Sequence, residues 1–266
     1  KGNKIKFSKI SVGASQQLIM SSVLATGKTV LSNLACESEV LDLTNFLISA
    51  GANIKWIGKR TCQIIGVNSL KETKYSVMGD RIETGTFCVV ASLARGDLLI
   101  KNFDPKLIKT ELNILKKVGA KIKLFKNSIQ IKGPEKIKSI RNITTREYPG
   151  FPTDLAPQFM ALLCKANGTS SITENIFQGR FLHAMELQRL GAKITIKNRT
   201  AKIEGNTNFI AAEVMSSDLR ASAALVLAGI VSKGNTIVTR VYHCDRGYEN
   251  FENKLKKIGV KIKRLK

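Results

Sequence analysis

The chain is poor in the residues that mark membrane and nucleic-acid-binding proteins. Only 6% of its residues are aromatic, so few rings are present to stack on bases. Its longest apolar run, residues 221–231, is interrupted by Ser222 and Gly229 and is too short to cross a bilayer. No charged-then-apolar leader opens the sequence. We therefore expect neither a membrane partner nor secretion.

Metal-binding and disulfide patterns are also absent from the sequence. The five cysteines are an odd number without paired ligand spacing, as expected of reduced thiols. The two histidines, His183 and His243, are too isolated to indicate a metal site or a catalytic triad. We expect a cytoplasmic protein without a metal site.

Acidic residues are scarce relative to basic ones. The chain has 43 Lys and Arg against 20 Asp and Glu, a formal net charge of +23. Such charge attracts polyanions, but the lysines are spread along the chain without a basic arm. We attribute the charge to solvated faces and expect no nucleic-acid partner, while a nucleic-acid-binding module stays open as an alternative.

What the sequence does contain is a block that recurs four times. With 43% hydrophobic residues and no low-complexity tract, the chain is ordered and globular. Each block has a polar residue, an apolar helix, a glycine, a short strand, a second helix and a second glycine. Both glycine series step by 66 to 72 residues: Gly27, Gly96, Gly168 and Gly234, then Gly51, Gly119, Gly191 and Gly259. The constant step indicates a repeat architecture.

Each first helix is preceded by a residue suited to capping it. These residues lie 14 to 16 positions before the glycine and are Ser11, Asp80, Asp154 and Asp218. Their side-chain oxygens can accept hydrogen bonds from the first free amides of a helix. Because helix N-termini carry partial positive charge, several such ends brought together would hold phosphate or carboxylate.

Periodicity assigns the remaining elements. Alternation predicts hairpins over residues 122–131 and 194–203, and a helical stripe joins Ile108, Leu112, Leu115 and Val118. The fourth block stops before its return strands. We therefore expect an α/β (α+β) fold and infer that the chain is the C-terminal portion of a longer protein.

Five segments resemble a known family, in register along the whole chain. They are residues 9–13 (Lys-Ile-Ser-Val-Gly), 79–86 (Gly-Asp-Arg-Ile-Glu-Thr-Gly-Thr), 148–154 (Tyr-Pro-Gly-Phe-Pro-Thr-Asp), 218–222 and 245–248. Their order and spacing are similar to those of the enolpyruvyl (carboxyvinyl) transferases of the EPSP synthase family, in the branch that acts on UDP-N-acetylglucosamine. About the first 150 residues of that family have no counterpart here.

The resemblance implies a fold and a domain division. The family fold is an inside-out α/β barrel of βαβαββ blocks around buried parallel helices, with an active site between two domains. Four of six blocks would be present. Residues 1–78 would be the remaining block of the first domain, and residues 79–266 a second domain of three blocks that lacks its last edge strand.

The resemblance also implies a reaction. The family transfers the enolpyruvyl group of phosphoenolpyruvate to the 3'-hydroxyl of UDP-N-acetylglucosamine, the first committed step of peptidoglycan synthesis, and requires no metal or organic cofactor. We expect this chain alone to be inactive, with a complementary N-terminal half as its partner. The alternatives are a 3-phosphoshikimate 1-carboxyvinyltransferase and a non-catalytic remnant.

Three catalytic residues follow from the same match. Asp154 would handle the sugar hydroxyl proton. Without the family resemblance, it is a helix cap that follows a stiff run, residues 149–152. Arg246 would contact phosphoenolpyruvate, or else pair with Asp245 on the surface. Arg220 is a weaker candidate of the same type that could instead bridge blocks.

The substrate-binding residues implied by the match are Lys9, Ile10, Ser11, Val12, Gly13, Asp154 and Ile176. The first five would hold the nucleotide part of the sugar donor, and Ile176 would lie near the sugar. Gln178 stands where the family often has glutamate. The loop cysteine that serves as acid in the family, and its N-terminal lysine, have no match here.

Overall fold

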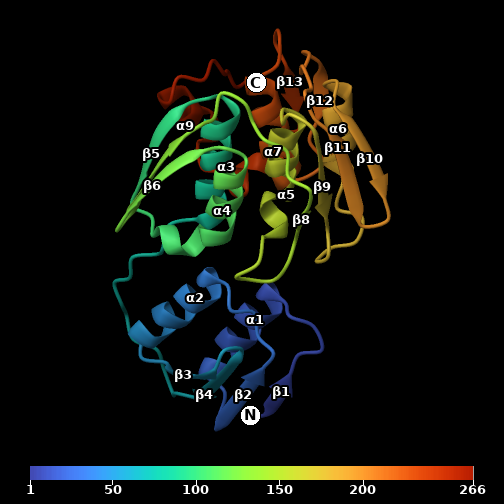
Figure 1. Cartoon of the computed structure of the whole chain (residues 1–266). Helices are drawn as coiled ribbons and strands as arrows, with labels where there is room; N and C mark the ends of the chain where they lie inside the picture. Colours follow the sequence, from blue (N-terminus) through green and yellow to red (C-terminus); the bar gives the residue numbers. More distant parts are fainter. Residues whose placement is uncertain (266) are drawn as a thin grey trace. The chain divides into compact units, whose positions relative to one another are not determined.

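The computed structural model describes residues 1–265, which form two compact units (Figure 1). Unit 1 contains residues 1–78 together with residues 147–149, and unit 2 contains residues 79–146 and those from 150 onward. Helices and strands alternate in both units, so the expected mixed α/β content is confirmed. Each unit has its own apolar core.

Unit 1 is a four-stranded sheet with two helices. Its elements in chain order are β1 (Lys4–Lys6), α1 (Val12–Val23), β2 (Lys28–Ser32), α2 (Ser38–Ser49), β3 (Asn53–Gly58) and β4 (Thr61–Ile65). The strand order is β1-β2-β4-β3, with β1 parallel to β2 and the other pairs antiparallel. This element order, βαβαββ, is that of one complete block.

Unit 2 holds the other three blocks, of which the first is α3 (Arg81–Leu93), β5 (Asp97–Lys101), the 3-10 turn η1 (Pro105–Ile108), α4 (Lys109–Lys117), β6 (Lys121–Phe125) and β7 (Ser128–Lys132). The second is β8 (Ile143–Thr144), η2 (Thr153–Leu155), α5 (Ala156–Cys164), β9 (Thr169–Thr173), α6 (Leu182–Arg189), β10 (Lys193–Lys197) and β11 (Thr200–Glu204). The third is β12 (Glu213–Met215), α7 (Leu219–Ile230), β13 (Ile237–Thr239), α8 (Tyr242–Asp245) and α9 (Phe251–Lys257).

The sheets of unit 2 are ordered β5-β7-β6, β10-β11-β9-β8 and β12-β13. Both predicted hairpins are confirmed, since Ile122 pairs with Ile131 and Ile194 pairs with Ile203 in antiparallel register. The strands β12 and β13 pair in parallel, and no return strand joins them among the described residues. Figure 1 shows the sheets outside and the first helices of the blocks inside this unit.

The inner helices α3, α5 and α7 pack against one another and form the centre of unit 2. All nine residues of α5 are buried, and most of α3 and α7 is buried too. A helix that is apolar on every side is stable only when other elements surround it. The outer helix α4 is amphipathic instead, and the predicted stripe from Ile108 to Val118 is buried as expected.

Three of the four predicted helix caps are confirmed. Ser11, Asp80 and Asp218 accept hydrogen bonds from the first amides of α1, α3 and α7. The cap expected at Asp154 is wrong: this residue lies inside η2, α5 begins after Leu155, and no side chain caps it. The carboxylate of Asp154 is therefore available for other contacts.

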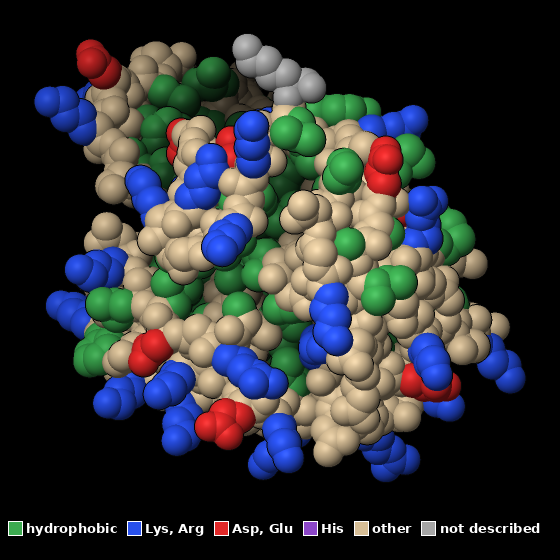
Figure 2. Space-filling view, turned by 90° about the horizontal axis from the view of Figure 1, so that it is seen from above, with side chains coloured by type: hydrophobic (Ala, Val, Ile, Leu, Met, Phe, Trp, Pro, Cys, Tyr) green, Lys and Arg blue, Asp and Glu red, His purple; other side chains and the backbone are tan. Residues whose placement is uncertain are grey.

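The thiols and the charges agree with the composition. All five cysteines are free and buried, and burial raises the pKa of Cys62, Cys88, Cys164 and Cys244 to about 12. Figure 2 shows Lys and Arg side chains dispersed over the face in view, with few acidic side chains among them. Among the described residues, no helix has the length and apolarity needed to cross a bilayer.

Candidate active site

The position of Asp154 is fixed by packing on both sides of η2. Before it, Phe151 is buried edge-on against Phe159 of α5, with ring centroids 4.9 Å apart. After it, Leu155 is fully buried against Gly85 of α3, where a Cβ atom would lie only 2.5 Å from Leu155 Cδ1. The short turn between these anchors leaves its carboxylate partly exposed and facing two arginines.

Asp154 forms ion pairs with arginines from two other elements. Its Oδ2 accepts hydrogen bonds from Arg220 Nη2 at 2.9 Å and Nε at 3.2 Å, while Oδ1 accepts one from Arg180 Nη1 at 2.8 Å. Arg220 lies in the first turn of α7, and Arg180 lies in the loop before α6. The geometry joins two blocks of unit 2 at one carboxylate.

Arg220 is the more enclosed of the two arginines, with 13% of its side chain exposed. Its guanidinium carbon lies 5.7 Å from the centroid of the Tyr248 ring, a cation–π arrangement. The Tyr248 hydroxyl is in turn bonded to Thr86 at 2.8 Å and Gln158 at 3.1 Å. Arg220 Nη1 is buried and has no hydrogen-bond partner among the described residues. A buried donor without a partner is unusual in a folded protein.

A buried carboxylate, Glu174, orders the loop that carries Arg180. Its oxygens accept hydrogen bonds from the hydroxyls of Thr145 and Thr153, both at 2.7 Å, and from the backbone amides of Ile176 and Phe177. Thr153 also accepts a hydrogen bond from Arg180. Glu174 therefore positions the Asp154 turn and the Arg180 loop together.

The electrostatics keep Asp154 ionised. Burial by itself would raise the pKa of Asp154, but the charges and hydrogen bonds of Arg220 and Arg180 outweigh it and hold the pKa below its usual value. A carboxylate held in this way is charged at neutral pH and accepts a proton poorly. It becomes a better base only when an arginine moves to another anion.

His183 lies next to this cluster, in a small cavity that Pro157, Arg180, Leu182 and Asp218 also line. Burial lowers the pKa of His183 to about 4; nearby Asp218 opposes this shift and Arg180 adds to it. The imidazole is therefore neutral at physiological pH. No hydrogen-bond partner for its Nε2 is present in the described part of the chain.

The predicted nucleotide-binding residues lie in unit 1, at the start of α1. Ser11 caps the helix through a 3.3 Å bond from the amide of Ala14. Lys9 and Gly13 are exposed, and a Cβ on Gly13 would meet nothing within 4 Å. Ile10 and Val12 are half-buried against the core of unit 1. The segment presents free amides and a lysine to solvent.

The structure brings Asp154 and Arg220 together but gives Arg246 no such contact. Arg246 is exposed at the end of α8, and it forms no hydrogen bond or ion pair within the described residues. The alternative pairing with Asp245 is wrong, because Asp245 instead binds Arg264 through two hydrogen bonds. Ile176 is half-buried beside Glu174.

Comparison with known proteins adds to this geometry. The family model of EPSP synthase (3-phosphoshikimate 1-carboxyvinyltransferase) matches residues 1–255. The chain belongs to the EPSP synthase family. Among family members, UDP-N-acetylglucosamine 1-carboxyvinyltransferase from Pelagibacter ubique (strain HTCC1062) is 59% identical over 264 residues. The protein of the same name from Koribacter versatilis (strain Ellin345) is 46% identical over 265 residues.

The match covers nearly all of this chain but only part of each EPSP synthase family relative. It spans 99% and 100% of the chain, and 63% and 61% of the Pelagibacter and Koribacter proteins. A solved structure, the enolpyruvyl transferase NikO from Streptomyces tendae, has a TM-score of 0.86 at 24% identity, covering 94% of this chain and 60% of that one. At this identity the likeness shows the fold alone.

Two residues of this family member's site were missed by the sequence reasoning. Arg180 follows the strand β9 in a loop without periodicity, and a single arginine in a basic chain carries no signal. Glu174 gave a weak signal, because a buried carboxylate directly after the end of a strand is unusual. The Asp154 cluster consists of Asp154, Arg180 and Arg220, which come from three separate segments that only the fold brings together.

Proposed function

We propose that the protein of which this chain is part transfers the enolpyruvyl group of phosphoenolpyruvate to the 3'-hydroxyl of UDP-N-acetylglucosamine. This is the first committed step of peptidoglycan synthesis, through which the protein would support cell shape and division. In this proposal residues 1–78 are one block of a first domain, and unit 2 is a domain of inside-out barrel type. The five buried free thiols favour a reducing compartment, here the cytoplasm.

The observation that carries the proposal is the Asp154 cluster with its unpartnered donor. One carboxylate is held by two arginines, and Arg220 Nη1 is buried with no partner among the described residues. An anionic substrate group placed there would satisfy that donor and form a charge-assisted hydrogen bond. The 59% identity to a carboxyvinyltransferase supports the choice of substrates.

The geometry gives each residue of the cluster a task. The phosphate or carboxylate of phosphoenolpyruvate binds Arg220 and Arg180, which loosens their hold on Asp154 and raises its pKa. Asp154 then accepts the proton of the 3'-hydroxyl as that oxygen bonds to C2 of phosphoenolpyruvate, and C3 takes up a proton from the general acid, which the family resemblance places outside this chain. Loss of a C3 proton expels phosphate and leaves the enolpyruvyl ether.

The other predicted residues are assigned to substrate binding. The amides of residues 11–13 at the start of α1, with Lys9, suit the diphosphate of the sugar nucleotide. Ile176 offers an apolar contact to the sugar, and Arg246, which has no partner among the described residues, offers a guanidinium to phosphoenolpyruvate. These assignments rest on the family resemblance together with the exposure of the side chains.

A chimera tests the proposal. Residues 1–266 would replace the aligned part of the Pelagibacter relative, and phosphate release from phosphoenolpyruvate would be followed with either UDP-N-acetylglucosamine or shikimate 3-phosphate. We expect turnover with the sugar nucleotide alone, and a fall in kcat of at least about 100-fold in Asp154→Asn. Asp245→Asn, the same change at an exposed carboxylate, is the control. Turnover only with shikimate 3-phosphate, or an Asp154→Asn variant as active as its parent, would overturn the proposal.

A further inference from the structure

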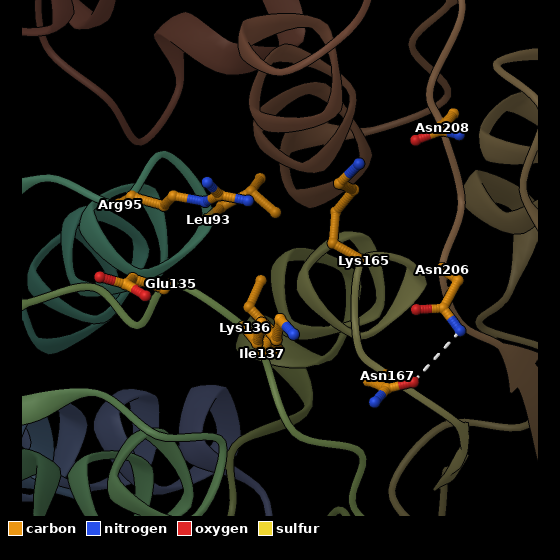
Figure 3. Close-up of a pocket in the computed structure, with 9 residues that line it drawn as sticks. All are labelled: Leu93, Arg95, Glu135, Lys136, Ile137, Lys165, Asn167, Asn206 and Asn208. Atoms are coloured by element: carbon orange, nitrogen blue, oxygen red, sulfur yellow. Dashed lines mark hydrogen bonds between the residues drawn. The ribbon is translucent and has the colours of Figure 1, made fainter.

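A second hollow lies in unit 2 (Figure 3). It has a volume of about 470 Å³ and is lined by residues that follow the ends of two inner helices, among them Arg95 after α3 and Lys165 after α5. Lys136 lies on the loop that leads from β7 to β8 and also faces the hollow. We call this hollow the basic pocket.

The basic pocket and Asp154 lie at opposite ends of the same helices. Asp154 is two residues before the start of α5, whereas Lys165 directly follows its end. Nine helical residues separate them by about 14 Å along the axis. The first turns of α3, α5 and α7 meet at Tyr248 and Asp154, so a ligand in the basic pocket would not touch that cluster.

The cations of the basic pocket lack anionic partners. Arg95 and Lys136 form no hydrogen bond or ion pair with the described residues, and Lys165 donates one hydrogen bond, to the backbone oxygen of Thr207 at 2.7 Å. Glu135 is the single acidic residue among those that line the pocket. Burial lowers the pKa of Lys165, and the nearby charges of Arg95 and Lys233 lower it further. These like charges repel one another until an anion binds between them.

Helix C-termini carry partial negative charge, which opposes an anion at this end. However, carbonyl oxygens at these ends already accept hydrogen bonds from backbone amides. Ala91 O accepts from Gly96 N at 2.9 Å, Cys164 O from Thr207 N at 2.8 Å, and Ala166 O from Asn206 N at 2.8 Å. Three cations and one carboxylate leave a formal charge of +2 on the lining, and two helix ends remove roughly half a charge each. The basic pocket stays positive.

The backbone at Arg95 is a further unusual feature. Its φ of 57° lies in the left-handed region, which a residue with a Cβ seldom adopts. After α1, α5 and α7 the positive φ belongs to a glycine four residues past the helix, namely Gly27, Gly168 and Gly234, whereas Arg95 lies two residues past α3 and precedes Gly96 of the same series. Of the residues with positive φ that follow these four helices, Arg95 alone has a charged side chain. In Figure 3 the side chains of Arg95 and Lys165 both extend toward the hollow.

Amide side chains complete the lining on the side opposite Arg95. Asn206 donates to Asn167 Oδ1 at 3.4 Å, and the side chain of Asn208 forms no hydrogen bond with the described residues. Amide groups donate and accept hydrogen bonds and thus suit hydroxyl groups. The volume is that of a small-molecule site and exceeds what one phosphate ion fills.

We propose that the basic pocket binds a small phosphorylated polyol, with its phosphate between Arg95 and Lys165 and its hydroxyl groups against Asn206 and Asn208. Such a ligand neutralises the facing cations and forms hydrogen bonds with the Asn208 amide and with Asn206 in one step. Because α5 joins the two ends of unit 2, the ligand would also restrain the helix that begins beside Asp154.

Isothermal titration calorimetry on the 266-residue chain tests this, with glucose 6-phosphate, inorganic phosphate and glucose as probes. We expect glucose 6-phosphate to bind at least tenfold more tightly than inorganic phosphate, and glucose to give no measurable binding. Arg95→Gln and Lys136→Glu should each weaken binding at least tenfold. Lys126→Glu, the same change in the exposed turn of the β6–β7 hairpin, should leave it unchanged.

A variant of the other cluster shows which site is titrated. Arg220→Gln should bind glucose 6-phosphate as the parent chain does, because Arg220 lies at the opposite end of the helices. Equal affinities for glucose 6-phosphate and inorganic phosphate, no binding of either, parent-like binding in Arg95→Gln, or loss of binding in Arg220→Gln would each overturn the proposal. Thermal melts of each variant confirm that it is folded.

Discussion

Replacing Asp154 by asparagine should destabilise unit 2 through the arginines that it leaves behind. Arg220 donates two hydrogen bonds to one oxygen of Asp154, and Arg180 donates one to the other. The variant keeps the shape of the side chain but removes its charge. Arg220, with 13% of its side chain exposed and Nη1 already without a partner among the described residues, would then be a nearly buried cation without a counterion.

The size of the effect follows from exposure. Removing one partner of a fully buried ion pair costs about 3–5 kcal/mol. Because 35% of the Asp154 side chain is exposed, solvent screening reduces this to about 1–3 kcal/mol. A double-mutant cycle with Arg220→Met should give a coupling energy of about 2 kcal/mol, and one with the more exposed Arg180 about 1 kcal/mol. The Asp245–Arg264 pair, 47% and 41% exposed, should give at most about 0.5 kcal/mol.

Urea unfolding of the 266-residue chain measures these energies by linear extrapolation. Far-UV circular dichroism follows both units, whereas the fluorescence of Trp56, the single tryptophan, follows unit 1. Only the transition seen by circular dichroism should move in the Asp154 variants. The reasoning fails if the Asp154–Arg220 coupling is no larger than that of the exposed control pair, or if Arg180 proves the stronger partner.

Three further predictions concern unit 2. Burial lowers the pKa of His183 to about 4 and raises that of Glu111 to about 7. Between pH 4 and 6.5 His183 binds a proton in the unfolded chain but not in the folded one, so its contribution to stability falls as the pH falls. Between about pH 4.5 and 7 Glu111 keeps its proton in the folded chain but not in the unfolded one, so its contribution falls as the pH rises. The two effects oppose each other. In urea unfolding from pH 4 to 7, the free energy of unfolding should rise with pH in Glu111→Gln and fall with pH in His183→Gln, by a total of up to about 3 kcal/mol in each variant. Gly85→Ala should displace Leu155 and weaken phosphoenolpyruvate binding by the chimera, whereas Gly58→Ala, whose Cβ would make only ordinary contacts with Thr61, should not. Asp80→Ala should lower the stability of unit 2 by about 1 kcal/mol in urea unfolding, since the helix α3 loses its cap.

Much of the fold could be predicted because the pattern is local. Glycine spacing, capping residues and alternation act within one block, and they located the inner helices, the hairpins and the caps at Ser11, Asp80 and Asp218. The same rule failed at Asp154 because a turn of 3-10 helix precedes α5 there and moves the first free amides beyond the reach of its side chain. The exception to the repeat is the carboxylate that forms ion pairs with two arginines.

The Asp154 cluster could be predicted only in part, because its contacts are not local. Asp154 and Arg220 are each marked by their place before or in an inner helix, so the repeat indicates both. Arg180 and Glu174 come from a loop, where neither periodicity nor capping constrains the residue type. Their contacts form only because the loop is buried against other segments, and packing between blocks determines that burial.

The two anion sites that we propose lie at opposite ends of the inner helices of unit 2. At the first turns of α3, α5 and α7 the partial positive charge of the helix ends has the same sign as Arg220, although Asp80 and Asp218 already accept hydrogen bonds from the first amides of α3 and α7. At the last turns the backbone contributes negative charge, and Arg95, Lys136 and Lys165 must exceed it. An anion at the first end therefore gains from the helix dipoles, whereas one at the basic pocket is held by side chains alone. Added salt should accordingly weaken binding at the basic pocket more steeply than binding beside Asp154, because its exposed cations are screened and buried Arg220 is not.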